Sequence, residues 1–190
     1  MFFVYSAIGV GAVALLLVIL LVAHRGRSRV QVRPVTAEDT LRVMEVTVAP
    51  GSDERPYAGL AGMIHKAQDE QALRRFACAC AAYAVKDASL TDKAVLDALK
   101  IGESLADQGS APKGLEQTRR VVNDIADQFD TQDTEDAPNK SAFDKARAAQ
   151  AVLACLGDDA KTAAAEACYE VLTATDDVDA ITRIADETLR

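Results

Sequence analysis

Apolar and polar residues are distributed unevenly along the chain, in three successive patterns. Residues 1–24 contain no Asp, Glu, Lys or Arg and are mostly apolar. A helix that rises about 1.5 Å per residue would carry this segment across the roughly 30 Å hydrocarbon layer of a bilayer. It would also satisfy every backbone hydrogen bond within the segment. The first pattern therefore predicts a transmembrane helix at residues 1–24.

A cleaved secretory signal is the alternative interpretation of these residues. Such a signal has a basic start, a shorter apolar run and small residues before the cleavage site. Here no Lys or Arg precedes the long apolar run, and a cut after Ala23 would have the bulky Leu21 where a small residue is needed. We therefore favour a retained anchor. Within it, Ala7 and Gly11 form a small-xxx-small pair that would let another membrane helix pack closely, although small residues are common throughout the span.

A basic collar follows the predicted span. Basic residues in the loop beside a span set its orientation, with the basic side in the cytoplasm. We therefore expect the N-terminus outside and the C-terminal domain in the cytoplasm, at the cytoplasmic (inner) membrane. The collar has a second possible role in binding anionic lipid head groups. Its residues are Arg25, Arg27, Arg29 and Arg33.

The second pattern, at residues 30–56, permits two local structures. Val30–Val32 and Leu41–Val48 are rich in β-branched residues, which favours a small β-hairpin near the membrane. Thr36 followed by Asp39 also resembles the capping box of a helix, on which Leu41, Met44 and Val48 would share a face. Valine and threonine dominate, so we favour extended structure. Residues 49–56 contain two prolines and a glycine, which is typical of a linker.

The third pattern begins after Tyr57, where apolar residues recur at spacings of three and four. Thr91 is a plausible N-cap and Gly109 a stop signal. The domains expected are thus the span at 1–24, the collar and linker at 25–56, and a helical cytoplasmic domain at 57–190. Short connections predict an all-α bundle or short helical stack, without the period of a named repeat class. The six predicted helices cover residues 68–86, 91–108, 112–129, 141–156, 159–174 and 178–189.

Composition and charge sharpen this picture. Hydrophobic residues make up 49% of the chain, but 36 of the 190 residues are alanine, so we expect a lean core with closely packed helices. An alanine seam is predicted in the helix at 141–156. The net charge of −8 divides into an uncharged span, a collar of +4 and a remainder of −12, which makes nucleic-acid binding improbable. The seam residues are Ala142, Ala146, Ala149, Leu153 and Leu156.

Two consecutive helical motifs occupy residues 60–109. The first has the form LRxFACxC, and the second ends near an Ala-Asp-Gly sequence that Gln108 interrupts here. The matching residues are Leu73, Arg74, Phe76, Ala77, Cys78 and Cys80, then Asp92, and then Ala106, Asp107 and Gly109.

With these motifs the segment resembles an alanine-rich helical segment found in uncharacterised proteins of planctomycete-type bacteria. The resemblance covers about 50 of the 190 residues. This chain departs from that family in its apolar N-terminal span and in lacking tryptophan-alanine tracts. Because the family has no settled activity, the resemblance implies no catalytic or binding residue. A more distant likeness to bacterial toxin-immunity helical domains is an analogy of fold.

Four cysteines invite a redox or metal interpretation. Cys78 and Cys80 lie about 200° apart around a helix, so they point to nearly opposite sides, unlike the Cys-x-x-Cys of thioredoxins or zinc sites. Cys155 and Cys168 lie on successive helices and could approach each other. A cytoplasmic domain keeps thiols reduced, and free cysteine is among the most buried residue types. We therefore interpret all four as buried small hydrophobic residues.

Other chemistry is sparse. His24 and His65 have no second histidine or cysteine nearby, so a metal site would lack ligands. No Ser-His-Asp arrangement, P-loop or dinucleotide fingerprint is present. We expect no enzyme activity, cofactor or catalytic residue. The acidic run at 127–136 lacks the order of a calcium loop and is interpreted as a solvated loop; its acids are Asp127, Asp130, Asp133, Glu135 and Asp136.

Two basic doublets stand out in the acidic domain, and they could meet an acidic partner or pair with neighbouring carboxylates. Intramolecular pairing is favoured because surface salt bridges are common. The doublets are Arg74 with Arg75 and Arg119 with Arg120.

Together these features predict a single-pass membrane-anchored helical interaction or scaffolding protein, such as an accessory subunit of a membrane complex. Its expected partners are the lipid bilayer and one or more proteins, and not nucleic acid. The alternative is a membrane-tethered immunity or regulatory protein that binds a basic effector through its acidic face.

Overall fold

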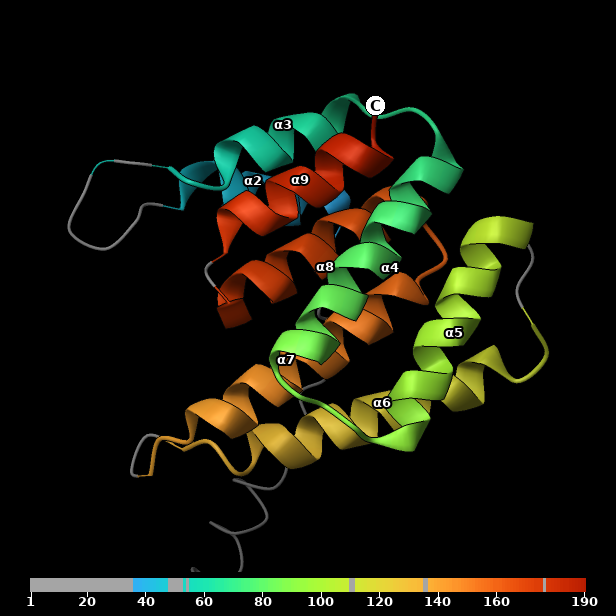
Figure 1. Cartoon of the computed structure of the whole chain (residues 1–190), viewed down its shortest axis with the longest axis vertical. Helices are drawn as coiled ribbons and strands as arrows, with labels where there is room; N and C mark the ends of the chain where they lie inside the picture. Colours follow the sequence, from blue (N-terminus) through green and yellow to red (C-terminus); the bar gives the residue numbers. More distant parts are fainter. Residues whose placement is uncertain (1–35, 48–52, 54, 110–111, 135–136, 176) are drawn as a thin grey trace, which may run out of the picture. The chain divides into compact units, whose positions relative to one another are not determined.

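All regular elements in the described part of the chain are α-helices, apart from one isolated antiparallel bridge between Thr134 and Ala137. The computed structural model describes residues 36–47, 53, 55–109, 112–134, 137–175 and 177–190 (Figure 1). The all-α prediction is confirmed. The helices are α2 (Ala37–Val46), α3 (Ala58–Lys66), α4 (Glu70–Asp87), α5 (Lys93–Gln108), α6 (Leu115–Asp130), α7 (Lys140–Cys155), α8 (Ala160–Thr175) and α9 (Val178–Thr188).

Side-chain caps explain why most of these helices begin where they do. Asp69 accepts a hydrogen bond from the backbone N–H of Gln71 at 2.9 Å, and Asp92 accepts one from Ala94 at 2.8 Å. The first N–H groups of a helix have no partner within it, and a short polar side chain satisfies them. Further caps are provided by Asn139 to α7, Asp159 to α8 and Asp177 to α9.

The centre of the fold consists of α4, α7 and α8, which all contact one another. In Figure 1, α4 runs through the middle of the helical part, with α5 and α6 on one side and α2, α3 and α9 on the other. The contacts agree with this view, because α6 packs on α7, while α2 packs on α8 and α9 on α4. The last of these contacts includes a hydrogen bond from the Tyr83 hydroxyl to Asp177, at 2.7 Å. Asp177 thus caps α9 and ties it to α4.

Alanine forms much of the buried surface of α7 and α8, two helices that pack on each other. Ala148 and Ala151 of α7, and Ala164 and Ala167 of α8, are all fully buried. Small side chains at a contact let two helix axes approach closely. Ala146 and Ala149 of the predicted seam are buried as expected, whereas Leu153 is only partly buried and lies at the wall of a groove described below.

The prediction of extended structure within residues 30–56 is wrong for the helical residues 37–46. Residues 37–46 form α2, and Thr36 and Asp39 form the complete capping box of the alternative interpretation. The Asp39 backbone N–H donates to Thr36 Oγ1 at 3.3 Å, and the Thr36 backbone N–H donates to Asp39 Oδ2 at 3.1 Å. Local capping and burial of Leu41 and Met44 outweigh the β-branched composition. Val30–Val32 and Val48 lie outside the described residues.

Helix boundaries differ from the predicted ones by a few residues. Asp92, and not Thr91, is the N-cap of α5, and Gly109 ends that helix in the left-handed conformation (φ 67°), as predicted. The helix expected from residue 112 begins at Leu115. Neither α2 nor α3 was among the six predicted helices. By its contacts, the unit that contains all eight described helices begins at residue 35.

The predicted membrane span at residues 1–24, its Ala7 and Gly11 pair and the arginine collar at 25–33 lie outside the described residues. Among the helices that the structure does describe, none is both long and apolar enough to cross a bilayer.

Candidate functional site

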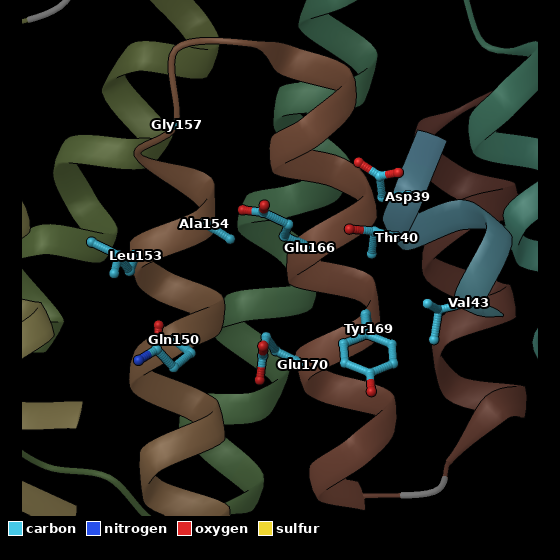
Figure 2. A pocket seen from close by; sticks show the side chains of 10 residues that line it. All are labelled: Asp39, Thr40, Val43, Gln150, Leu153, Ala154, Gly157, Glu166, Tyr169 and Glu170. Carbon is cyan, nitrogen blue, oxygen red and sulfur yellow. The ribbon is translucent and has the colours of Figure 1, made fainter. Parts of the chain in front are cut away.

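A groove between α2, α7 and α8 is the larger of two prominent hollows in the described part of the chain. Its volume is about 570 Å³, within the range of ligand-binding pockets. Figure 2 shows side chains from all three helices around it. We call it the acidic groove. It is lined by Asp39, Thr40 and Val43 of α2, Gln150, Leu153 and Ala154 of α7, Gly157 after α7, and Glu166, Tyr169 and Glu170 of α8.

Helical spacing places the α8 residues on the groove. Tyr169 and Glu170 follow Glu166 by three and four residues, so both lie beside it on one face of the helix. In Figure 2 the two glutamate side chains lie between α7 and α8, and the Tyr169 ring lies toward α2. The opposite face of α8 is filled by alanine, cysteine and valine. The two glutamates of α8 therefore both lie at the groove.

The two glutamates experience an unfavourable environment for negative charge. Partial burial and the neighbouring Glu170 raise the pKa of the Glu166 carboxyl. Burial also raises the pKa of Glu170, although Arg147 opposes that effect. Among the described residues Glu166 makes no ion pair, and this leaves its charge uncompensated on a partly apolar wall.

Arg147 is already engaged with other carboxylates. Its guanidinium donates to Glu170 Oε2 at 3.1 Å and to both oxygens of Asp130, at 2.9 and 3.1 Å. Its buried Nε has no hydrogen-bond partner within the described residues. Asp130 was predicted to lie in a solvated loop, but it is the last residue of α6. Its ion pair with Arg147 joins α6 to α7. Arg147 therefore compensates the negative charge of Glu170 and makes no ion pair with Glu166.

A smaller hollow of about 340 Å³ lies between α4 and α5. Arg75, Glu103 and Asp107 are its charged residues, and Cys78 also lines it. Since Cys78 is 5% exposed, it is the most accessible of the four cysteines. The remaining lining residues are alanines: Ala79, Ala82 and Ala106.

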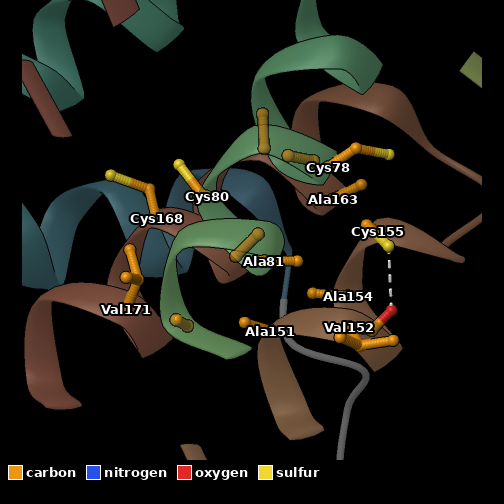
Figure 3. Close-up of a cluster of buried hydrophobic side chains, with 14 of the residues drawn as sticks. Cys78, Cys80, Ala81, Ala151, Val152, Ala154, Cys155, Ala163, Cys168 and Val171 are labelled. Atoms are coloured by element: carbon orange, nitrogen blue, oxygen red, sulfur yellow. Dashed lines mark hydrogen bonds between the residues drawn. The ribbon is translucent and has the colours of Figure 1, made fainter. Parts of the chain in front are cut away.

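All four cysteines are free and buried, as predicted. Cys78 and Cys80 do point to different neighbours. Cys78 meets Cys155, and Cys80 meets Cys168 (Figure 3). The predicted approach of Cys155 to Cys168 is therefore replaced by two pairs, each of which joins α4 to another helix.

The thiols of these pairs are in surroundings that disfavour reaction. Burial and the Cys168 thiol raise the pKa of Cys80 well above its ordinary value. The Cys78 thiol and burial do the same for Cys155, whose Sγ also donates to the Val152 carbonyl oxygen at 3.0 Å. A reactive cysteine needs a stabilised thiolate, and these surroundings oppose one.

One arginine of each predicted doublet binds the turn between α7 and α8. Arg74 donates to the carbonyl oxygens of Gly157 and Asp158, at 2.9 and 2.5 Å. Arg119 donates through Nε to the Leu156 carbonyl oxygen at 3.1 Å, and through Nη2 to the Asp158 carboxylate at 2.6 Å. These two side chains provide hydrogen-bond donors for the backbone carbonyl groups at and just after the C-terminal end of α7.

The second members of the doublets lie elsewhere. Arg75 reaches Asp69 at 3.9 Å, and Arg120 is exposed with no ion pair among the described residues. Arg74 and Arg119 therefore hold the turn between α7 and α8, whereas Arg75 and Arg120 are exposed at the surface.

No group of three or more His, Cys, Asp or Glu in the described part of the chain is placed to hold a metal ion. His65 lies in the last turn of α3, where its carbonyl oxygen accepts from Lys161 Nζ at 3.0 Å. His24, Glu135 and Asp136 lie outside the described residues.

Sequence reasoning missed the acidic groove, although a signal for it was present. Glu166 and Glu170 are the acidic residues of a sixteen-residue helix otherwise made largely of small and apolar residues. Two carboxylates one turn apart in such a helix indicate either a buried ion pair or a binding surface. The tertiary structure shows an ion pair between Glu170 and Arg147 of α7, beside a groove that α2 completes along Glu166. Comparison with protein-family models, with curated proteins and with solved structures finds no significant match to this chain.

Proposed function

We propose that this chain is a single-pass membrane-anchored interaction or scaffolding protein, and that the acidic groove is its binding surface for another protein. The observation that carries the proposal is the groove itself. It combines an uncompensated carboxylate, Glu166, with an apolar wall. Pockets of this kind bind ligands through apolar contact and a few placed polar groups.

The surface beside the groove extends its apolar area. Val43, on the groove wall, is 45% exposed, and Val46, one turn further along α2, is 57% exposed. They are the large hydrophobic side chains that are exposed in the described part of the chain. Adjacent exposed apolar residues beside a hollow are typical of a protein-binding surface.

The membrane part of the proposal rests on the sequence alone. The uncharged apolar run at 1–24 and the arginines that follow it support a span with the helical domain in the cytoplasm. The test is alkaline carbonate extraction of membranes, together with topology reporters fused after Arg190. Retention in the pellet and a cytoplasmic reporter signal are expected. Release of the chain by carbonate would contradict the anchor.

The binding surface is tested by photo-crosslinking in the cells that make the protein. A photoreactive amino acid at position 43 of the full chain should give an adduct with a specific protein. The matched control is the same amino acid at Gln117, which is exposed on α6. Equal adducts at both positions, or none at Val43, would contradict a binding role for the groove.

The carboxylates of the groove also favour the second candidate function, an immunity or regulatory protein for a basic effector. Opposite charges across an interface steer association and select partners. The identity of the crosslinked protein separates the two. A membrane-complex subunit supports the scaffolding role, whereas a basic effector encoded next to this chain supports the immunity role.

A further inference from the structure

We propose that the acidic groove binds an amphipathic helix of a partner protein, and that one lysine or arginine of that helix pairs with Glu166. This inference rests on the proposed function and deepens it by stating the chemistry of the partner. Three features of the groove lead to it: its uncompensated charge, its apolar rim and the helices that form its walls.

Charge complementarity selects a cationic side chain. Asp39, Glu166 and Glu170 all line the groove, and Arg147 engages Glu170 from the side of α7. Glu166, on the same helix one turn before Glu170, has no such counter-charge among the described residues. A lysine or arginine placed here would relieve the repulsion between the two glutamates and form a charge-assisted hydrogen bond with Glu166. The Tyr169 ring beside it is a suitable surface for a cation.

The rim selects apolar neighbours for that cation. Leu153 and Ala154 form the α7 wall, and Val43 forms the α2 wall, with Val46 continuing the exposed apolar surface outside. A small polyamine would gain nothing from this outer surface. A basic side chain that is flanked by apolar residues of the same partner would bury this surface. Burial of apolar surface supplies most of the binding energy at the centre of protein interfaces.

The walls favour a helical partner. The groove is bordered by helices, whose backbone N–H and C=O groups are already paired, so it offers no strand edge for an extended peptide. An amphipathic helix instead binds through side chains at positions one turn apart. For this groove, the partner helix would present a basic side chain with an apolar side chain one turn before it and another one turn after it.

A second copy of this chain fits the groove poorly. It would have to present a lysine or arginine among exposed apolar side chains. In the described part of the chain the large exposed apolar side chains are Val43, which lines the groove, and Val46, which lies one turn further along α2. The described part of a second copy thus offers no such segment away from the groove, and we take the partner to be a different protein.

The test uses the full chain in its native membranes, with the photoreactive amino acid at position 43. Mass spectrometry of the adduct should identify a peptide whose sequence has apolar residues at helical spacing and a lysine or arginine three or four positions from them. The variant Glu166→Gln should lower the yield of this adduct about tenfold or more, because it removes the counter-charge. The matched variant Glu187→Gln, an exposed glutamate on α9, should leave the yield unchanged.

A charge exchange completes the test. Glu166→Lys should abolish the adduct, and replacing the identified basic residue of the partner by glutamate should restore it. Rescue of this kind shows pairing between the two residues and excludes a general loss of folding. Circular dichroism of the purified variants checks that they remain helical.

The outcomes separate the two proposals. No specific adduct at position 43 refutes the proposed function and this inference together. An adduct that persists in Glu166→Gln, or a partner peptide without a basic residue, refutes this inference and leaves the proposed function in place. An adduct with a second copy or with the arginines at 25–33 of the same chain also refutes it. Binding of spermidine to the purified chain, lost in Glu166→Gln, would assign the groove to a small cation instead.

Discussion

Gly102 of α5 lies directly against the Cys155 thiol of α7. A Cβ atom on Gly102 would lie 2.7 Å from Cys155 Sγ and 3.4 Å from Cys78 Sγ. Real Cβ atoms do not approach a sulfur so closely, so glycine is required for α5 to reach α7 and α4 at this point. Cys155 cannot move aside easily, because it is 1% exposed and donates to the Val152 carbonyl oxygen.

We expect Gly102→Ala to destabilise the fold by about 1–3 kcal/mol, the usual cost of an extra methyl group in a packed core. This outcome opposes the normal effect of alanine, which stabilises a helix relative to glycine by roughly 0.5–1 kcal/mol. Thermal or denaturant unfolding measures the change. The double variant Gly102→Ala with Cys155→Ala should recover most of the loss.

Gly62 provides the matched control for that experiment. It lies within α3, and an added Cβ would meet no atom within 4 Å. Gly62→Ala should therefore be neutral or stabilising. A Gly102→Ala variant as stable as Gly62→Ala would contradict the close packing of α5 on α7.

We expect the guanidinium of Arg119 to stabilise the fold through the geometry of its hydrogen bonds as well as through its charge. It is 19% exposed and binds the Leu156 carbonyl oxygen together with two carboxylates, of Glu116 and Asp158. The single ammonium group of lysine cannot reproduce this fork. Arg119→Lys should therefore cost about 1–3 kcal/mol of the free energy of unfolding.

The neighbouring Arg120 tests this explanation. Because Arg120 is exposed, Arg120→Lys should change the free energy of unfolding by less than about 0.5 kcal/mol. Chemical denaturation of both variants compares them directly. Equal effects would show that the turn between α7 and α8 does not depend on the Arg119 side chain.

The stability of the fold should depend on the protonation of Glu166. Its pKa is raised above the ordinary value of 4.5, so the folded state retains a proton that the unfolded chain has already released. Stability from this group is present at low pH and is lost as pH rises from 4.5 through the raised pKa. The carboxylates that line the groove with it are Glu170 on the same helix and Asp39 on α2, and Arg147 of α7 pairs with Glu170.

Glu166→Gln should consequently stabilise the protein at neutral pH and flatten this part of its pH dependence. The gain should not exceed about 1 kcal/mol, because solvent screens a half-exposed carboxylate. Urea denaturation at mildly acidic and neutral pH, with Glu187→Gln as control, measures the difference. A Glu166→Gln variant that is less stable at neutral pH would contradict the raised pKa. Stabilisation of this kind is expected for the proposed binding role of the groove, since binding groups are often poorly compensated in the free protein.

The cysteines should differ in their rate of alkylation. Cys78 contributes to the hollow between α4 and α5 and should react first. Cys80 and Cys155 are more buried and have raised pKa values, so they should react at least about tenfold more slowly in the native protein. Timed iodoacetamide labelling followed by mass spectrometry gives each rate, and labelling in denaturant should remove the differences. Equal native rates would show that the helical core opens as a whole.

Local signals in the sequence were most informative where one residue decides a local structure. Gly109 ends α5 because the left-handed conformation suits glycine, and this could be predicted without any tertiary contact. Thr36 with Asp39 gave an equally local signal for α2, but the valines that follow favoured the wrong structure. The capping box proved the better guide because burial of Leu41 and Met44 against the rest of the fold stabilises the helix.

By itself, the sequence determined the helical class, most of the helices and the burial of the cysteines, because apolar periodicity and capping are properties of neighbouring residues. Only the tertiary structure decided that Cys78 meets Cys155, that Arg74 and Arg119 reach the same turn, and that α2 lies beside Glu166 and Tyr169. Each of these contacts joins residues distant along the chain. In an alanine-rich protein many helix faces are alike, so the choice among them depends on how all the helices fill space together.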